Sequence, residues 1–378
     1  MGNSKAQRTS KNKVPHLLFR DILRLSAQTN ADKNGNGVDK RLLQKLEQLL
    51  QEENSKEINP LVPLIYRNIK AQQKPPLSKQ LLAKMKYLTH QAIAIDMENQ
   101  KILSNVFSLL GDENIKVILL KSAAFSGTLY SHAAPRIGLD LDIMVQPRDL
   151  KKAFQILSQI AKPKEAPAQR FYSHHTSFEH TFKVKTTDNA EVIIELHTDF
   201  FHQGLFSEIP HAFWTQSIPH PEYEQGNVRM LCPEHNLIHL AIHAFGNLSY
   251  THHNLLDAHE LMSQNKIDWA LLYTVADTMR SRKALYALLT HTTAIFGTNV
   301  SMTPQKSLGL TPIKAATIKI ASGLPDKLEL PFKGISYRVL QMMIWPIMCD
   351  RTQDFFKFQK AYFKKRKHDL LQYKSSKK

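Results

Sequence analysis

The sequence has few cysteines, no long apolar run and a shortage of acidic residues. Cys232 and Cys349 are the two cysteines among 378 residues, and they form no C-x-x-C pair. This argues against a disulfide-linked secreted domain and suits a reducing compartment, so we expect a cytoplasmic protein. The longest apolar run, residues 339–349, spans about 11 residues and contains Pro346, whereas a membrane-spanning helix needs about 20. The N-terminus also lacks the apolar core of a secretory signal. We therefore expect no transmembrane segment.

Acidic side chains number 33 against 50 Lys and Arg, which gives a formal net charge of +17. Much of the excess lies at the two ends. Residues 1–13 carry four basic residues and no acid, and residues 357–378 carry nine basic residues and one acid. Such an excess suits nucleic acid, an anionic membrane surface or solubility alone. Because basic tails of this kind are more often solvating than binding, nucleic acid is a partner that we do not favour.

The hydrophobic pattern predicts a change from helices to strands and back. Apolar residues recur at three- and four-residue steps before residue 108 and again after residue 233, which indicates helices in both regions. Between them lie short apolar and β-branched runs, with helical patterns after the first two. The predicted strands are residues 117–120, 141–145, 178–184 and 191–197, and the helices among them are 122–131 and 147–161. Residues 163–170 are predicted to form a loop, and residues 297–330 are predicted to be loosely structured.

These patterns predict an α+β fold, in which a small mixed β-sheet core with helices is flanked by N-terminal and C-terminal helical regions. The length allows two or three domains with cores of their own. In chain order we expect a basic disordered tail (1–13), an N-terminal helical region (14–108), the core (109–220), a helical domain (221–300), a loop plus helical region (301–356) and a basic tail (357–378).

Two aspartates interrupt the apolar run of residues 138–145. Asp140 and Asp142 are two positions apart, so on a strand their side chains point to the same face, with Cα atoms roughly 6–7 Å apart. Carboxylates at this spacing can share divalent cations, and a pair of such ions is the usual apparatus for transferring nucleotidyl or phosphoryl groups. An edge strand or a turn-capping Asp is the alternative explanation for the same pattern.

Two further segments carry candidate polar groups. Lys121 and Ser122 follow the first predicted strand at the start of a helix, where backbone N–H groups can bind an anion. Taken alone, an ordinary helix start beside a solvated lysine explains them better. Glu195 and His197 share one face of the strand at 191–197. A buried carboxylate needs a partner, which for Glu195 is either a metal ion or a Lys or Arg side chain.

Taken together, these segments resemble the nucleotidyltransferases of the DNA polymerase beta type, and among them an uncharacterised bacterial group. That group is similar to this chain in having a Lys-Gly step after the first strand, an Arg before a D-h-D-h-h-V strand, and a later E-L-H strand. The matching residues here are Lys121-Ser122, Arg136, residues 140–145 and residues 195–197. The resemblance covers about residues 117–297. Ser122 stands where the group usually has Gly, which could narrow the approach of the backbone to a phosphate.

The resemblance implies that residues 109–220 form a nucleotidyltransferase core. Asp140 and Asp142 would hold two Mg²⁺ ions, with Mn²⁺ as a substitute, and Glu195 would complete the site by deprotonating or orienting an acceptor hydroxyl. Lys121, Ser122 and Arg136 would contact a nucleoside triphosphate such as ATP. The acceptor stays open, and a small molecule, a sugar, a protein side chain and a nucleic acid end all fit.

Histidines form two further groups. His174, His175 and His180 lie in one segment, and His235, His239 and His243 recur every four residues. Histidines at i and i+4 can bind zinc, but the general-base Glu of H-E-x-x-H is absent. We therefore favour packing between the helical half and the core, with His197 and His239 near the cleft.

Two rival functions stay open. A catalytically inactive protein with the same fold could bind RNA or another anionic partner through its basic tails. Converging carboxylates argue against this, because without a metal they would repel a phosphate. A metal-dependent phosphohydrolase that uses the histidines is the function that we favour least.

Overall fold

The structure is a computed structural model, and it describes residues 16–27, 40–51, 58–71, 77–138, 140–164, 179–186, 189–201, 204–223, 226–248, 253–301, 303–327 and 335–360. The predicted tail at 1–13, most of the tail at 357–378, the predicted loop beyond residue 164, and His174 and His175 lie outside the described residues. The described part of the chain has an α+β architecture, as the sequence predicts. Within that part, no helix is both long enough and apolar enough to cross a membrane.

The N-terminal region is helical because its apolar residues recur on one side of each segment. Ile22 and Leu23, Leu46, and Ile65 are fully or almost fully buried, and they belong to three successive helices. A longer helix follows, and its N-terminus is capped by the Ser78 hydroxyl, which accepts a hydrogen bond from the Leu81 N–H at 3.1 Å. In chain order these elements are α1 (His16–Ser26), α2 (Lys40–Gln51), η3 (Asn59–Leu61), α3 (Val62–Lys70) and α4 (Lys79–Asp112).

A mixed sheet forms the centre of the described chain, with the strand order β3-β4-β5-β2-β1-β7-β6. Strand β2 is parallel to β5 and antiparallel to β1, and β1 is parallel to β7. The four predicted strands are confirmed, while β3, β6 and β7 are too short to leave a sequence pattern. The strands are β1 (Val117–Leu119), β2 (Asp140–Met144), β3 (Lys162–Pro163), β4 (Glu179–Lys185), β5 (Glu191–His197), β6 (Ile218–Pro219) and β7 (Val228–Met230).

The two faces of the sheet differ because side chains alternate along each strand. Leu141 and Ile143 of β2 and Ile194 and Leu196 of β5 are buried on one face. Helix α6 (Leu150–Ile160) covers that face through Phe154, whose ring lies 4.9 Å from the Phe182 ring of β4. The other face carries the acidic side chains of β2 and β5. One face is therefore a hydrophobic core, and the opposite face is free for polar chemistry.

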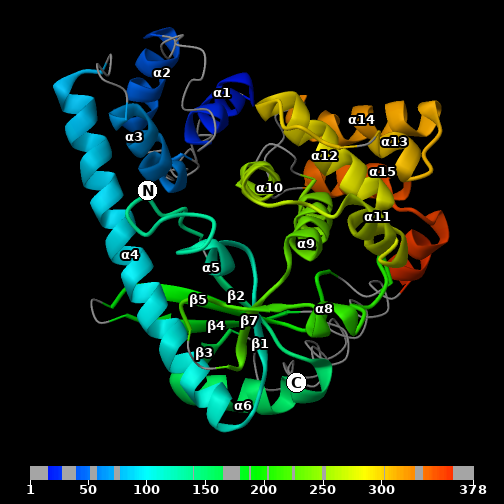
Figure 1. Cartoon of the computed structure of the whole chain (residues 1–378), viewed down its shortest axis with the longest axis horizontal. Helices are drawn as coiled ribbons and strands as arrows, with labels where there is room; N and C mark the ends of the chain where they lie inside the picture. The colour runs from blue at the N-terminus through cyan, green and yellow to red at the C-terminus, as the bar shows by residue number, and fades with distance from the viewer. Residues whose placement is uncertain are drawn as a thin grey trace, which may run out of the picture.

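The helices surround the sheet in two groups (Figure 1). Helix α4 runs from α1–α3 at one end, along the sheet, to α6 at the other, while α9–α15 form the second group on the opposite side of the picture. The remaining elements are α5 (Lys121–Phe125), η4 (Pro147–Asp149), α8 (Ala212–Thr215), α9 (Pro233–Gly246), α10 (His253–Gln264), α11 (Trp269–Thr278), α12 (Arg282–Phe296), α13 (Pro304–Ser307), α14 (Pro312–Lys327) and α15 (Ile335–Met348).

Two sequence predictions were wrong in detail. Residues 297–330 are not loosely structured, because they contain α13 and the 16-residue α14. Their Gly and Pro content masked a helical pattern in which Ala315, Ile318 and Ala321 are buried at three-residue steps. The helix predicted at 122–131 ends at Phe125, two residues before Gly127, whose φ of 71° does not continue a helix. The proposed division of the chain into domains stays a prediction.

Candidate active site

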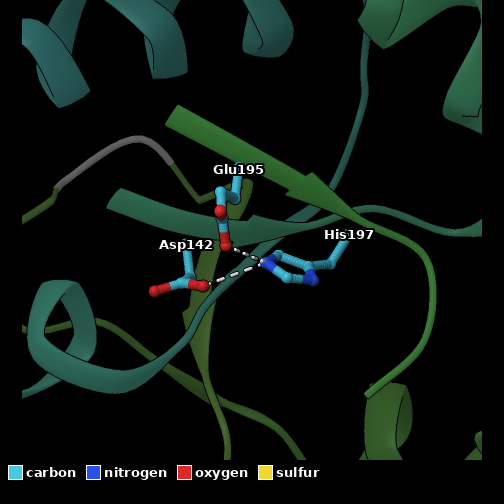
Figure 2. Close-up of side chains that lie close together, drawn as sticks. All are labelled: Asp142, Glu195 and His197. Atoms are coloured by element: carbon cyan, nitrogen blue, oxygen red, sulfur yellow. Dashed lines mark hydrogen bonds and ion pairs between the residues drawn. The ribbon is translucent and has the colours of Figure 1, made fainter. Parts of the chain in front are cut away.

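The predicted acidic residues of β2 and β5 lie on one face of the sheet. Asp142 pairs directly with Glu195 in the parallel register, and Asp140 lies two positions before Asp142. His197 lies two positions after Glu195 and turns toward both carboxylates (Figure 2). Asp142, Glu195 and His197 each offer one ligand atom, and these atoms all lie within 4.8 Å of one another. Among the described residues, these three side chains form the one group of at least three His, Cys, Asp or Glu that could hold a metal ion.

Asp142 is fully buried and is compensated by two positive partners. The Lys121 ammonium donates to its Oδ1 atom at 2.6 Å, and His197 Nε2 lies 2.9 Å from the same oxygen. The other oxygen, Oδ2, is buried and has no hydrogen-bond partner among the described residues. Unpaired buried carboxylate oxygens are costly unless a cation or a donor meets them. This oxygen therefore fits a metal ligand, and Glu195 supplies a second carboxylate beside it.

The charges of the site shift one another's pKa values. Burial would raise the pKa of the Asp142 carboxyl, but Lys121 and His197 outweigh it and hold that pKa well below its ordinary value. Burial would lower the pKa of His197, yet its contacts with Asp142 and Glu195 raise it to about 9. Burial, and then the charge of Asp142, raise the pKa of Asp140 to about 6. At neutral pH two cations thus lie against Asp142, and Asp140 is mostly ionised, although it takes up a proton at a higher pH than an ordinary aspartate does.

The turn between β1 and α5 brings Lys121 to Asp142. Lys121 has a φ of 50°, a left-handed conformation that costs a residue other than glycine about 1–2 kcal/mol. Ser122 follows it and is buried. Behind Ser122 lies Gly138, where an added Cβ would overlap the Ser122 Oγ atom. The serine that stands at a usual Gly position in the resembling group is thus accommodated by a glycine in the loop before β2.

Glu179 belongs to the same polar face, and we did not predict it from the sequence. It is the first residue of β4 and pairs with His197 in the antiparallel register. Burial, and then the charge of Glu195, raise its pKa above the ordinary value. The alternation of residues 178–184 could have shown which face Glu179 occupies, but not that β4 lies beside β5. Asp199, just beyond β5, was not predicted either, and burial raises its pKa to about 7.

Arg136 points to α10 and forms a buried ion pair there. Its Nη2 atom lies 2.6 Å from Oδ2 of Asp257, and the Tyr130 hydroxyl donates to the other oxygen of Asp257 at 2.8 Å. Burial raises the pKa of Asp257 to about 6, and Arg136 opposes that rise. This pair joins the loop before β2 to the helical half of the protein. A contact between Arg136 and phosphate stays a prediction.

The three histidines of α9 pack against aromatic or amide side chains. His235 stacks on Phe213 with ring centroids 3.8 Å apart, and the His239 ring lies 4.6 Å from that of Phe200. His243 Nδ1 lies 2.9 Å from the Asn254 amide nitrogen. Burial lowers the pKa of His239 to about 3, and the nearby Lys121 charge acts in the same direction. These side chains are therefore neutral packing groups, and His239 lies close enough to the site to feel its charges.

The sequence matches a protein family described as uncharacterised nucleotidyltransferase over residues 57–297, more than half of the chain. The chain belongs to this family. The matched residues include α4, the whole sheet and α9–α12, so they contain the cluster of Asp142, Glu195 and His197. Neither the curated proteins nor the solved structures gave a match.

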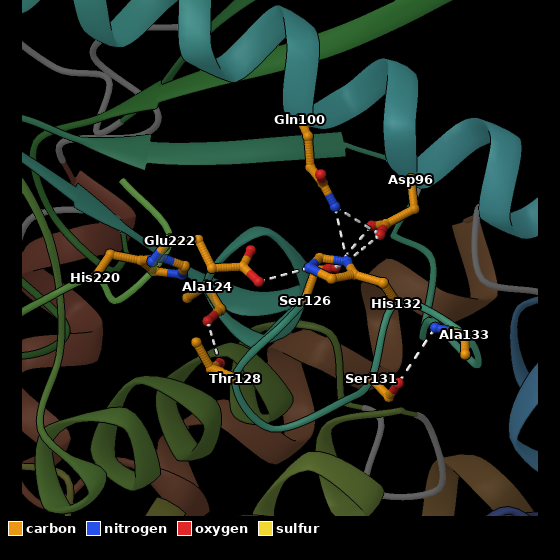
Figure 3. A network of polar contacts seen from close by, with 10 residues as sticks. All are labelled: Asp96, Gln100, Ala124, Ser126, Thr128, Ser131, His132, Ala133, His220 and Glu222. Carbon is orange, nitrogen blue, oxygen red and sulfur yellow. Dashed lines mark hydrogen bonds and ion pairs between the residues drawn. The ribbon is translucent and has the colours of Figure 1, made fainter. Parts of the chain in front are cut away.

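A second polar network lies between α4 and the loop before β2 (Figure 3). His132 Nδ1 lies 2.7 Å from Oδ2 of Asp96, and its Nε2 lies 2.6 Å from Oε1 of Glu222. Ser126 donates to the other Asp96 oxygen at 2.7 Å. Burial would lower the pKa of His132, but both hydrogen bonds favour the protonated ring and raise its pKa above the ordinary value. A small cavity beside this network is lined in part by Asp96, Ser122, Arg136 and Glu222.

We expect Gly138→Ala to destabilise the protein by about 1–3 kcal/mol, because the new methyl group would overlap Ser122. Ser122→Gly removes the overlapping atoms, so the double variant should recover part of the loss. Urea unfolding of the wild type, both single variants and the double variant gives the coupling free energy. Strictly additive losses would show that the two positions do not depend on each other.

His132→Gln should lower stability more at pH 6 than at pH 9. The folded pKa of His132 is raised, so its stabilising effect is present below the unfolded pKa of about 6.5 and is lost as pH rises through the folded pKa. We expect about 1 kcal/mol or less at pH 6, since solvent screens a partly exposed pair. Urea unfolding at both pH values measures this, with the exposed His90→Gln on α4 as control. An equal loss at both pH values would contradict the assigned charge.

Proposed function

We propose that this protein is a metal-dependent nucleotidyltransferase that moves a nucleoside monophosphate from a nucleoside triphosphate to a hydroxyl acceptor. The observation that carries the proposal is the convergence of Asp142, Glu195 and His197 within 4.8 Å, inside the residues that match the nucleotidyltransferase family. A buried Asp142 oxygen without a hydrogen-bond partner among the described residues supports a cation at this place.

We assign Asp140, Asp142 and Glu195 to hold two Mg²⁺ ions, for which Mn²⁺ can substitute. Carboxylate oxygens are the ligands that these hard cations prefer. When bound, the ions would neutralise charge on the triphosphate and lower the pKa of the attacking hydroxyl. His197 belongs to the same cluster, and it would add a ligand atom only after its imidazole loses the proton that it holds against Asp142.

The chain's own groups account for the proton and for substrate placement. The acceptor oxygen bonds to the α-phosphorus, the bond from that phosphorus to the oxygen bridging to the β-phosphate breaks, and pyrophosphate leaves with the electron pair. We assign Glu195 to take or orient the hydroxyl proton, because it belongs to the cluster and, unlike Asp142, is only half-buried. Lys121 and Ser122 are assigned to the triphosphate, and the buried pair of Arg136 with Asp257 favours a structural role for Arg136.

One observation favours a second candidate, a protein of the same fold that has lost catalysis. Lys121 lies 2.6 Å from Asp142 and His197 lies 2.9 Å from the same oxygen, so two cationic side chains already balance this carboxylate. Such a protein would use its basic residues to bind RNA or another anionic partner. Its binding would fall steeply with salt and would not need magnesium.

Incubation of the protein with each labelled nucleoside triphosphate and Mg²⁺ tests the proposal directly. We expect one nucleotide to give magnesium-dependent release of pyrophosphate or self-labelling. Binding of the same nucleotide, measured by calorimetry with and without Mg²⁺, provides a readout that needs no acceptor. Failure of every nucleotide to bind in the presence of Mg²⁺, together with magnesium-independent RNA binding, would support the inactive candidate instead.

Asp142→Asn and Glu195→Gln should each lower the transfer rate by about 10²-fold or more, since each removes a charge at the reacting centre. The matched control is Glu191→Gln. It removes the same charge from the exposed start of β5, the strand of Glu195, where Glu191 pairs with Lys183 at 2.6 Å. The control should keep wild-type turnover. Circular dichroism and urea unfolding establish that each variant is folded. A folded Asp142→Asn protein with wild-type turnover would disprove the assignment.

A further inference from the structure

The outer side of α15 is apolar. Val339, Met342, Met343 and Ile347 have 51, 49, 64 and 39% of their areas exposed. They recur at three- and four-residue steps, so they form one stripe along the helix, which we call the α15 stripe. Its opposite side is buried in the protein core through Leu340, Ile344, Trp345 and Met348. A contiguous exposed apolar stripe of this kind marks a contact surface rather than a solvent-facing one.

The helical segments next to α15 expose further apolar side chains. Phe356 is 65% exposed in the helical segment that follows α15. Helix α14 packs beside α15 and exposes Ile313 and Ile320 at 79% and 67%. The C-terminal region thus presents several large apolar groups to solvent, whereas most other helices bury theirs.

All exposed charged side chains in the described residues 303–324 and 339–360 are basic. They are Lys306, Lys314, Lys319, Arg351, Lys357 and Lys360. The two acids of these ranges are buried and paired. Asp350 lies 3.3 Å from Arg282, and Asp354 lies 2.7 Å from Arg280. The acids therefore do not offset the positive charge of the surface.

The sequence beyond the described residues adds to the same charge. Residues 361–378 contain seven Lys or Arg and one Asp, together with Tyr362, Phe363 and two leucines. Basic residues interspersed with aromatic and aliphatic ones are typical of segments that lie in the interface of an anionic bilayer. The exposed apolar groups and the basic excess thus occupy one continuous stretch of the chain.

We propose that the α15 stripe, together with the exposed basic residues of the described ranges 303–324 and 339–360, docks on the surface of an anionic lipid membrane. A lipid surface matches both features, because its acyl boundary takes up apolar side chains and its headgroups attract lysines. A nucleic acid would match the charge but leave the aliphatic stripe in water. A second copy of the chain would match the stripe but place lysines against lysines. This docking is peripheral and does not depend on the proposed transferase activity.

Co-sedimentation of the full chain with vesicles tests the proposal. We expect binding to phosphatidylcholine vesicles that contain about 30% phosphatidylglycerol and little binding to phosphatidylcholine alone. Binding should weaken when salt rises from about 0.1 M to about 0.5 M, since salt screens the lysines. No binding to anionic vesicles, or equal binding to both kinds, overturns the proposal.

A matched pair of variants locates the surface. Met343→Glu removes an apolar group from the stripe and adds repulsive charge, so anionic vesicle binding should fall at least about tenfold. Met97→Glu makes the same change at a methionine of equal exposure, 65% against 64%, on the distant α4, and should bind as the wild type does (Figure 1). Lys357→Glu combined with Lys360→Glu should lower binding by about tenfold or more.

Three outcomes would overturn the proposal even if vesicles bind. One is equal weakening by Met97→Glu and Met343→Glu. A second is a dimer that Met343→Glu dissociates while vesicle binding persists unchanged. A third is RNA binding that Lys357→Glu and Lys360→Glu abolish without any effect on vesicles. Urea unfolding should show wild-type stability for all variants, because the replaced side chains are exposed. None of these measurements uses a nucleoside triphosphate, so they are independent of the transferase assays.

Discussion

Burial of the Asp142 carboxylate is the constraint on which the site depends. Asp142 is fully buried on the central strand β2, where an ionised carboxylate is stable only beside compensating charge. Lys121 and His197 supply that charge through one oxygen, and the second oxygen keeps no hydrogen-bond partner among the described residues. The local backbone reflects this need, since Lys121 adopts a left-handed φ of 50° in the turn from which its ammonium reaches Asp142.

The alternation of strand residues explains how such a polar site coexists with a stable sheet. In β2 and β5, odd and even positions face opposite sides, so Ile143 and Ile194 pack under α6 while Asp142 and Glu195 meet on the other face. A shift of one residue in the β2–β5 register would place the acids in the core and the apolar groups in the site. The same register that stabilises the sheet therefore also aligns the carboxylates.

The sequence alone predicted the acidic face of the sheet better than the partners of its carboxylates. The two-residue spacing of Asp140 and Asp142, and the bounds of β5, follow from local periodicity, so the acidic face could be predicted. The ion pair of Lys121 with Asp142 could not, because it depends on a positive φ in a turn whose sequence contains no glycine. Glu179 was missed because its place beside His197 depends on the pairing of β4 with β5, which is a tertiary property.

The loop that precedes β2 is held from two sides, and this fixes where β2 begins. His132 joins it to α4 and to Glu222 through charge-assisted hydrogen bonds, and Arg136 joins it to Asp257 of α10. Removing one partner of a buried ion pair costs about 3–5 kcal/mol, so the Arg136 anchor resists movement strongly. Asp140 comes soon after this loop and pairs with Ile193 of β5, so the anchors on both helical regions and the sheet register act together on the start of β2.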